Sequence, residues 1–391
     1  MTLLLFIIII IFASWMIARA CDGFETSADY LGRNMTEGTK GATINAIGSS
    51  MPELWVTFIY LFLFHDTTGF SGGIGTTAGS AVFNAMVIPA LVIISVLWCA
   101  AGTKIQVSKS VILRDGVFLI SAELFLIYFI GEVLYWYHGL FLMLIYIFYA
   151  GWMVYRHKKN NSSNCVCVTE ADTEMDEEDS DFQEKDSEGT NNSRFISFFK
   201  IDLENAIIGN KALSTGNASL LLFISTLFIA AACWLLVYSC ENIGIALNLH
   251  GYFVAVIIAA AASSVPDTIL SIKDAGKGNY DDALANALGS NIFDICFALG
   301  APLFLYTIIY NPVSMTPDTV DHIVELRLLL LFLTILTFII FLSSKKMTKL
   351  TAGILISMYF AFVLYVAGRA YDIGIASAIA EKLHIIQGLI Q

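Results

Sequence analysis

Two stretches of this sequence follow one pattern, Gly48-Ser49-Ser50-Met51-Pro52-Glu53 and Ala262-Ser263-Ser264-Val265-Pro266-Asp267. On the next apolar segment, each is followed by a second matching stretch, Gly79-Ser80-Ala81-Val82-Phe83-Asn84 or Gly289-Ser290-Asn291-Ile292-Phe293-Asp294. A carboxylate near the bilayer centre costs about 2.5 to 3.5 kcal/mol on the membrane-insertion scale. A lone Ser or Pro in a membrane helix is usually a packing feature or a kink. Because the acids recur at matching positions, the pattern indicates a cation site.

The composition is that of a membrane protein that crosses the bilayer many times. The chain has 391 residues, of which 57% are hydrophobic and 14% are charged, whereas a soluble domain carries about 25% charged residues. Apolar runs long enough to span the roughly 30 Å hydrocarbon layer recur along the chain. We count ten, at about 3–20, 40–63, 74–100, 111–131, 137–155, 216–239, 250–272, 282–310, 325–343 and 350–368. The predicted fold is therefore all-α, with about ten transmembrane helices.

The distribution of Lys and Arg predicts the orientation of these spans. The outer connectors, residues 64–73, 132–136, 240–249 and 311–324, contain no Lys or Arg, and the inner connectors carry the basic residues. Only Arg327, Arg369 and Lys382 fall on or near the outer side. Residues 3–18 could be read as a signal peptide, but no basic residue precedes them and Arg19 follows, so a retained first span is favoured. Both termini are thus expected to be non-cytoplasmic, in the plasma membrane or an endomembrane.

A polar segment divides the chain into two halves. Residues 170–188 contain eleven acids and one Lys, a composition typical of disorder. The expected organisation is a first membrane half at 1–156, a largely disordered cytoplasmic acidic loop at 157–214, a second membrane half at 215–368 and an outer C-terminal tail at 369–391. The loop lacks the register of an EF-hand, and it is a candidate contact for cytoplasmic regulators. Otherwise the expected partners are inorganic cations and the lipid bilayer, with no nucleic acid.

The two halves are predicted to be inverted copies of one another. The first repeat covers about residues 40–100 and the second about 250–310, and they are separated by an odd number of spans. The same pattern therefore crosses the membrane in opposite senses, giving two inverted five-helix repeats. Inverted repeats build transporters whose binding site lies at the midplane between the halves.

The residue types in the repeats suit a hard cation. Proline removes a helical hydrogen bond and frees the carbonyl four residues earlier, here that of Gly48 or Ala262. Carbonyl, hydroxyl and carboxylate oxygens are the ligands that calcium prefers. Ser80 with Asn84, and Ser290 with Asp294, are four residues apart and share one helix face.

These motifs resemble the alpha-repeats of the cation/calcium exchanger superfamily, and most closely those of the potassium-dependent sodium/calcium exchangers. Three stretches carry the likeness to that branch: Cys21-Asp22-Gly23-Phe24, Ala81 within the first Gly-Ser stretch, and Val265-Pro266-Asp267-Thr268 with Asp294. One departure is Ala262, where the family has Gly; the added methyl group is expected to stiffen the kink.

The resemblance implies an antiporter that extrudes calcium, with no enzymatic activity and no cofactor. It implies that Glu53 and Asp267 are the central calcium ligands, shared with sodium, and that Asp294 is linked to potassium dependence. It further implies a set of polar ligands for sodium or calcium, namely Ser49, Ser50, Ser80, Asn84, Ser263, Ser264, Ser290 and Asn291. The three acids total −3 when ionised, which matches the +3 of one Ca²⁺ with one K⁺. The implied transport is Na⁺ against Ca²⁺ with K⁺, by alternating access.

Three alternatives stay open or are disfavoured at this point. A potassium-independent Na⁺/Ca²⁺ or Ca²⁺/H⁺ antiporter could use the same scaffold. An ion channel is disfavoured, because channels build filters from rings across subunits whereas these motifs pair within one chain. An intramembrane aspartyl protease using Asp267 and Asp294 is disfavoured, because its Gly-x-Gly-Asp signature is absent.

Overall fold

We describe the fold from a computed structural model of the chain. It describes residues 2–31, 33, 46–64, 69–99, 105, 108–164, 201–209, 213–344 and 346–390. The acidic centre of the predicted disordered loop, residues 170–188, lies outside these residues, so its disorder stays a prediction.

The first half is a series of helices with one short break. It consists of α1 (Thr2–Leu31), α3 (Ala46–Ser49), α4 (Met51–Leu63), α5 (Gly69–Cys99), α6 (Lys109–Phe129) and α7 (Trp136–Asn164), with strand β1 (Val133–Leu134) between α6 and α7. The short helix α9 (Leu203–Ile207) precedes the second half.

The second half has the same plan with more breaks. It consists of α10 (Thr215–Leu247), α11 (Gly251–Val254), the π-helix η2 (Ala255–Ala259), α12 (Ala260–Ser263), α13 (Val265–Gly276), α14 (Tyr280–Phe293), the π-helix η3 (Asp294–Ala298), α15 (Gly300–Ile309), α16 (Pro317–Ser343) and α17 (Lys349–Ala370). Strand β2 (Val313–Ser314) pairs antiparallel with β1 and joins the connectors of the two halves. The predicted C-terminal tail is largely helical, as α18 (Gly374–Ile390).

The expected spans correspond closely to these helices. Within the described residues, eight segments are long and apolar enough to cross a membrane. They match eight of the ten expected runs. Of the other two, residues 40–63 correspond to α3 and the 13-residue α4, and residues 111–131 correspond to α6, which includes Arg114, Asp115 and Glu123. The all-α polytopic class is confirmed.

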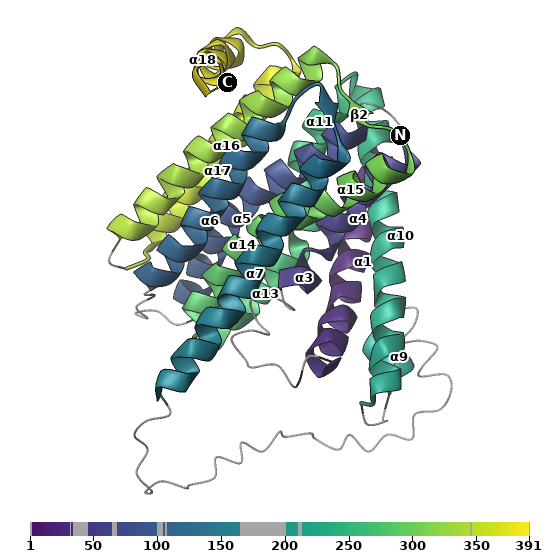
Figure 1. The fold of residues 1–391 in the computed structure, drawn as a ribbon, viewed down its shortest axis with the longest axis vertical. Coiled ribbons are helices and arrows are strands. Elements are labelled where there is room, and N and C mark those ends of the chain that lie inside the picture. Colours follow the sequence, from purple (N-terminus) through teal and green to yellow (C-terminus); the bar gives the residue numbers. More distant parts are fainter. Residues whose placement is uncertain are drawn as a thin grey trace, which may run out of the picture.

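The two halves are inverted with respect to one another. In Figure 1 the chain rises from α3 to α4, whereas the matching segment descends from α11 to α13. The start of α1 and the helix α18 lie towards the same, upper end of the bundle (Figure 1). The matched motifs therefore meet from opposite directions.

Each repeat has its main break at the same motif position. α3 ends at Ser49 and α4 begins at Met51; α12 ends at Ser263 and α13 begins at Val265. The proline of each motif lies in the first turn of the new helix, where the missing N–H is tolerated. Each new helix thus begins at the residue directly before the proline, with the second serine of the motif as its N-cap.

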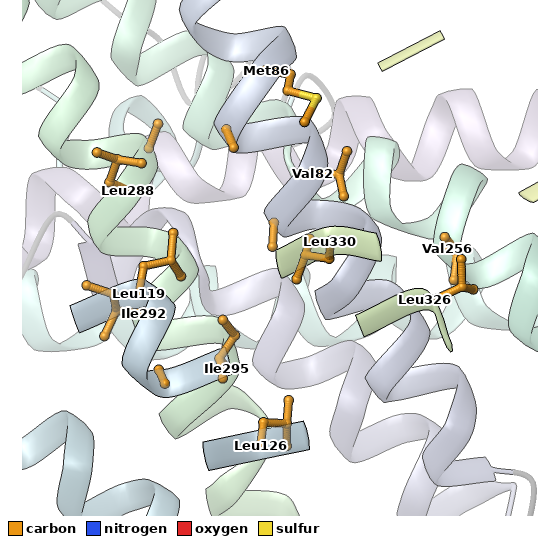
Figure 2. Close-up of a cluster of buried hydrophobic side chains, with 14 of the residues drawn as sticks. Val82, Met86, Leu119, Leu126, Val256, Leu288, Ile292, Ile295, Leu326 and Leu330 are labelled. Carbon is orange, nitrogen blue, oxygen red and sulfur yellow. The ribbon is translucent and has the colours of Figure 1, made fainter. Parts of the chain in front are cut away.

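The apolar interior forms two clusters. The larger is built around α5, α6, α14, α16 and α17, and Figure 2 shows part of it, including Val82 and Met86 on α5, Leu119 on α6, and Leu288 and Ile292 on α14. The smaller joins α1 to α10, with contributions from α4, α9 and η2. Among the described helices, α1 and α10 make the most extensive pair, so they form a unit that packs beside the repeat core.

Candidate cation site between the repeats

The breaks, together with α5, α14 and η3, place all eleven predicted site residues in the interior. Glu53 and Asp267 lie in the first turns of α4 and α13, and Asp294 begins η3. The whole set is fully buried: Ser49, Ser50, Glu53, Ser80, Asn84, Ser263, Ser264, Asp267, Ser290, Asn291 and Asp294. Buried carboxylates are costly unless they are paired with hydrogen-bond donors or cations.

Within each repeat, the Gly-Ser serine faces the acid of the broken helix. Ser80 Oγ lies 3.3 Å from Glu53 Oε1, and Ser290 Oγ donates to Asp267 Oδ1 at 2.9 Å. These two contacts join equivalent positions of the two repeats. The inverted duplication is therefore visible in the hydrogen bonds as well as in the sequence.

Other hydrogen bonds cross between the repeats. Asn84 Nδ2 donates to Asp267 Oδ2 at 2.9 Å, and Asn291 Nδ2 donates to the Ala81 carbonyl oxygen at 3.1 Å. Ala81 and Asn291 occupy equivalent places in the two Gly-Ser stretches. Since equivalent residues touch directly, the axis that relates the repeats passes close to this contact, and the polar cluster surrounds it.

Ser80 is the most connected residue of the cluster. Its Oγ is 2.8 Å from Ser264 Oγ and 3.3 Å from Asp294 Oδ2, in addition to its contact with Glu53. A hydroxyl has one proton but two lone pairs, so it can donate to one acid while an oxygen lone pair stays available to a cation. Ser80 thus bridges Glu53 and Asp294, one acid from each repeat.

Several oxygens of the cluster have no protein donor. In the described part of the chain, five buried side-chain oxygens without a hydrogen-bond partner lie here: Ser50 Oγ, Glu53 Oε2, Asn84 Oδ1, Asn291 Oδ1 and Asp294 Oδ1. Such atoms normally find a partner in folded proteins. All five are hard oxygen atoms, which is the ligand type that Ca²⁺ and Na⁺ accept.

The acids do not form a compact carboxylate cage. Among the described residues, no three His, Cys, Asp or Glu side chains are grouped so that they could hold a metal ion by themselves. Serine and asparagine oxygens instead lie between the carboxylates. Any cation at this site would be held by a mixed set of carboxylate, hydroxyl and amide oxygens.

The close packing of α5 against η2 depends on a single glycine. A Cβ added at Gly79 would lie 1.8 Å from the Val256 carbonyl oxygen and 2.6 Å from Ala260 Cβ. Only a residue without a side chain allows this approach, which brings Ser80 to Ser264. The glycine of the motif is therefore required by backbone contact.

Two thiols contact carbonyl groups beside the first break. Cys21 Sγ lies 3.9 Å from the Gly48 oxygen, and Cys233 Sγ lies 3.6 Å from the Pro52 oxygen. They come from α1 and α10, the two helices of the smaller apolar cluster. Cys233 could not be singled out from the sequence, since a lone Cys in an apolar span has no distinguishing pattern.

One charged residue of α16 lies inside the protein. Arg327, which the sequence places on or near the outer side, is fully buried, and its Nη1 lies 2.8 Å from Glu123 Oε1. It also donates to the Ile74 carbonyl oxygen at 3.0 Å and to Thr77 Oγ1 at 2.7 Å, both on α5. α16 begins at Pro317, well before the apolar run at 325, so Arg327 lies deep in the helix. The sequence does hold a sign of this buried pair, because Glu123 and Arg327 are opposite charges that each lie within an apolar span.

Comparison with known proteins places this arrangement in a family. A family model described as "Sodium/calcium exchanger protein" matches residues 1–155 and 217–368. The chain belongs to the sodium/calcium exchanger family. The matched residues cover nearly all of both membrane halves and leave out the acidic loop.

Individual relatives of this family member are named sodium/potassium/calcium exchangers. Sodium/potassium/calcium exchanger 5 of Homo sapiens is 27% identical over 375 residues, which cover 79% of this chain and 72% of that protein. Sodium/potassium/calcium exchanger 1 of Gallus gallus is 33% identical over 144 residues, 36% of this chain but only 21% of that protein. The match to the latter is thus confined to about a fifth of its length. These relatives are transporters and not enzymes.

Solved exchangers share the fold of this family member. The H⁺/Ca²⁺ exchanger CAX aligns with a TM-score of 0.55 at 12% identity, covering 98% of this chain and 91% of that one. The sodium–calcium exchanger NCX_Mj, soaked with Na⁺ and Sr²⁺, aligns with a TM-score of 0.50 at 20% identity, covering 93% of this chain and 98% of that one. At these identities the likeness concerns the fold alone.

Proposed function

We propose that this protein exchanges Na⁺ for Ca²⁺ together with K⁺, by alternating access at the buried cluster between the repeats. The observation that carries the proposal is the set of five unpartnered oxygens on Ser50, Glu53, Asn84, Asn291 and Asp294. They lie at the junction of two inverted repeats, which is where secondary transporters of this design place their substrate. The names of the sodium/potassium/calcium exchanger relatives supply the ions.

In this proposal the two broken-helix acids hold the divalent ion. Glu53 and Asp267 are the calcium ligands, and the same two carboxylates bind Na⁺ in the other half of the cycle. Ser49, Ser50, Ser263 and Ser264 lie at the breaks and supply hydroxyl or carbonyl oxygens. Because the helix ends at these breaks leave carbonyl groups without intrahelical partners, they add oxygen donors without added charge.

Asp294 is assigned to the potassium ion. It occupies the position that Asn84 has in the first repeat, so the site carries one more acid than a symmetric arrangement would have. Ser80 connects Asp294 to Glu53, which places the extra charge beside the calcium ligands. Three ionised acids balance one Ca²⁺ and one K⁺, and a neutral loaded site can be occluded at lower electrostatic cost than a charged one.

The alternating movement is assigned to the unit formed by α1 and α10. This unit has its own apolar cluster and contacts the first break through Cys21 and Cys233. We place both termini on the non-cytoplasmic side, as the Lys and Arg distribution indicates. The acidic loop is then cytoplasmic and is proposed as the contact for regulators.

The test is calcium uptake into sodium-loaded proteoliposomes diluted into sodium-free buffer, with and without external potassium. The proposal expects uptake that needs the outward sodium gradient and rises with potassium. Asp294→Asn, which copies the residue of the first repeat, should keep sodium-driven uptake and lose the response to potassium. Glu53→Gln should abolish uptake in both conditions.

Other outcomes point to the alternatives. Sodium-driven uptake without a potassium response would leave a sodium/calcium exchanger and overturn the potassium assignment. Uptake driven by a pH gradient instead of sodium would identify a Ca²⁺/H⁺ antiporter. Calcium flux that needs no counter-ion and does not saturate would identify a channel.

A further inference from the structure

The two helices of the α1–α10 unit carry a matched motif of their own. A tryptophan is followed six residues later by a cysteine and then by an acid, as Trp15, Cys21 and Asp22 on α1 and as Trp234, Cys240 and Glu241 on α10. The two tryptophans are 43% and 44% exposed, and both cysteines are buried. The inverted repeat therefore extends to α1 and α10, and Asp22 and Glu241 are equivalent acids.

The equivalent acids lie at opposite ends of the unit. In Figure 1, α1 descends from the upper end of the bundle, whereas α10 rises from its lower end, where α9 packs beside it. Asp22 lies in the lower part of α1, and Glu241 lies in the last two turns of α10. With the orientation proposed above, Asp22 is the inner acid and Glu241 is the outer acid.

The inner acid holds the unit to the repeat core. Asp22 Oδ1 lies 3.1 Å from Lys273 Nζ on α13, and Asp22 Oδ2 lies 3.4 Å from Arg19 Nη1 on its own helix. Lys273 lies six residues after Asp267, which is about 9 Å along α13 at 1.5 Å per residue. A polar pocket of about 370 Å³ between α1, α9 and α13 borders the ion pair. Water therefore reaches this contact and keeps it weak.

Tyr60 on α4 occupies the corresponding place at the outer end. It lies seven residues after Glu53, about 10 Å along α4 at 1.5 Å per residue, so it is nearly as far from the cation site as Lys273 is. Its ring is held against α5, where a Cβ added at Gly72 would lie 2.5 Å from it. Glu241 is close enough to the Tyr60 hydroxyl to act on it electrostatically.

The outer contact is not made in this structure. The Tyr60 hydroxyl is buried and has no hydrogen-bond partner, and the side chain is 1% exposed. Buried hydroxyls normally find a partner in folded proteins. The Glu241 carboxylate faces α11 instead, because a Cβ added at Gly251 would lie 2.8 Å from Glu241 Oε1. The structure thus shows the inner contact formed and the outer one open.

We propose that Tyr60 and Glu241 form an outer latch, which closes when the inner latch of Asp22 and Lys273 opens. As α1 moves away from α13 and the inner ion pair breaks, the outer end of α10 moves onto α4, and the Tyr60 hydroxyl donates to the Glu241 carboxylate. The exchange follows from the inverted repeats, because an arrangement that one half adopts is available to the other. The inference rests on the alternating access of the proposed function, and it does not depend on which ions are carried.

The experiment measures the rate at which N-ethylmaleimide labels Cys21 in the purified full chain. Cys21 is next to Asp22, its thiol contacts the Gly48 carbonyl oxygen, and its side chain is 1% exposed. It therefore reacts when α1 moves away from the first break, which is the state that the outer latch stabilises. The labelled peptide is quantified by mass spectrometry, so the other cysteines stay in place. One buffer is used throughout, without an ion gradient.

Variants of the two latches should change the labelling rate in opposite directions. Tyr60→Phe keeps the ring against α5 and removes the hydroxyl, so it should lower the rate about tenfold, the factor expected for one hydrogen bond to a charged group. Glu241→Gln should lower it too. Lys273→Gln removes the inner ion pair and should raise the rate. The double variant Tyr60→Phe with Lys273→Gln should lie between its two parents.

Tyr146→Phe on α7 is the matched control. Tyr146 is also buried, and its hydroxyl also has no hydrogen-bond partner, but it belongs to the apolar cluster of the repeat core. This variant makes the same chemical change away from the α1–α10 unit, so it should leave the labelling of Cys21 unchanged.

Three results would overturn the proposal. One is an unchanged labelling rate in Tyr60→Phe and Glu241→Gln. Another is a raised rate in these variants, which would mean that the two residues only support the packing of α4. The third is the absence of any rise in Lys273→Gln, which would mean that the inner ion pair does not hold α1. Because no ion gradient is used, a chain that responds as expected but fails the uptake assay would overturn the proposed exchange alone.

Discussion

At the scale of single residues, the site depends on hydroxyl and amide groups as much as on its acids. Glu53 and Asp294 come from different repeats, and the Ser80 hydroxyl lies within 3.3 Å of both. A residue that bridges the halves in this way affects ion binding without carrying a charge of its own.

Ser80→Ala should weaken calcium binding by about tenfold to a hundredfold, because hydrogen bonds to charged groups contribute about 1.5 to 3 kcal/mol. The measurement is the half-saturating calcium concentration for uptake in proteoliposomes. Ser95→Ala on the same helix is the control, since the Ser95 hydroxyl bonds to the Val92 carbonyl oxygen. An unchanged calcium dependence in Ser80→Ala would remove Ser80 from the site.

The buried ion pair of Arg327 and Glu123 stabilises the fold by linking α16 and α6 to α5. Arg327→Met should lower the free energy of unfolding by about 3 to 5 kcal/mol, because it leaves Glu123 as an uncompensated buried charge. The double variant Glu123→Gln with Arg327→Met should recover most of this loss. Thermal unfolding in one detergent would measure both variants. Additive losses in the double variant would show that the two residues do not act as a pair.

At the scale of elements, close backbone contact holds the broken helices in position. α5 approaches η2 so closely that a side chain at Gly79 would overlap the Val256 carbonyl group. This approach holds the Gly-Ser stretch of one repeat against the broken helix of the other.

Gly79→Ala should therefore lower both stability and transport. Forcing a methyl group into this contact is expected to cost about 1 to 3 kcal/mol. Gly353→Ala on α17 is the matched control: a Cβ there would meet nothing within 4 Å, so it should be neutral or stabilise by up to about 1 kcal/mol. The midpoints of thermal unfolding, read beside initial uptake rates, check this prediction. It fails if the two variants behave alike.

Some of these elements could be predicted from the sequence and others could not. The repeated acids and prolines predicted the inverted repeats and the residues that gather between them. The π-helices η2 and η3 were not predicted, because helices that are apolar on all sides give no periodicity signal to mark an extra residue per turn. The burial of Arg327 depends on its partners on α5 and α6, which lie far away in the sequence. α18 was treated as tail, since it is short and follows the last apolar run.

At the scale of the whole molecule, two packed units meet at the cation site. α1 and α10 form one unit, and the remaining membrane helices form the repeat core. The surface contacts between α1 and the core are weak: Lys273 Nζ of α13 lies 3.1 Å from Asp22 Oδ1 of α1, and both side chains are about half exposed. Exposed ion pairs of this kind contribute about 1 kcal/mol or less, so they can break during a transport cycle.

If the α1–α10 unit moves against the core, covalent links should have opposite effects according to where they are placed. Asp22→Cys with Lys273→Cys, joined by a short bismaleimide, ties the unit to α13 and should stop exchange. Gly23→Cys with Ser225→Cys ties α1 to α10 within the unit, because a Cβ at Gly23 would lie 2.7 Å from Ser225 Oγ, and oxidation there should leave exchange largely intact.

Both pairs would be made in a background without Cys165 and Cys167, which lie in the acidic loop. Uptake would be measured before and after cross-linking in the same vesicles, and release of the engineered α1–α10 disulfide by reductant serves as the internal control. Because the first link joins the unit to the core and the second stays within the unit, full activity with the α1–α13 link in place would contradict the movement. Loss of activity with the α1–α10 link alone would show that α1 and α10 must separate from each other, and the moving part would then be a single helix.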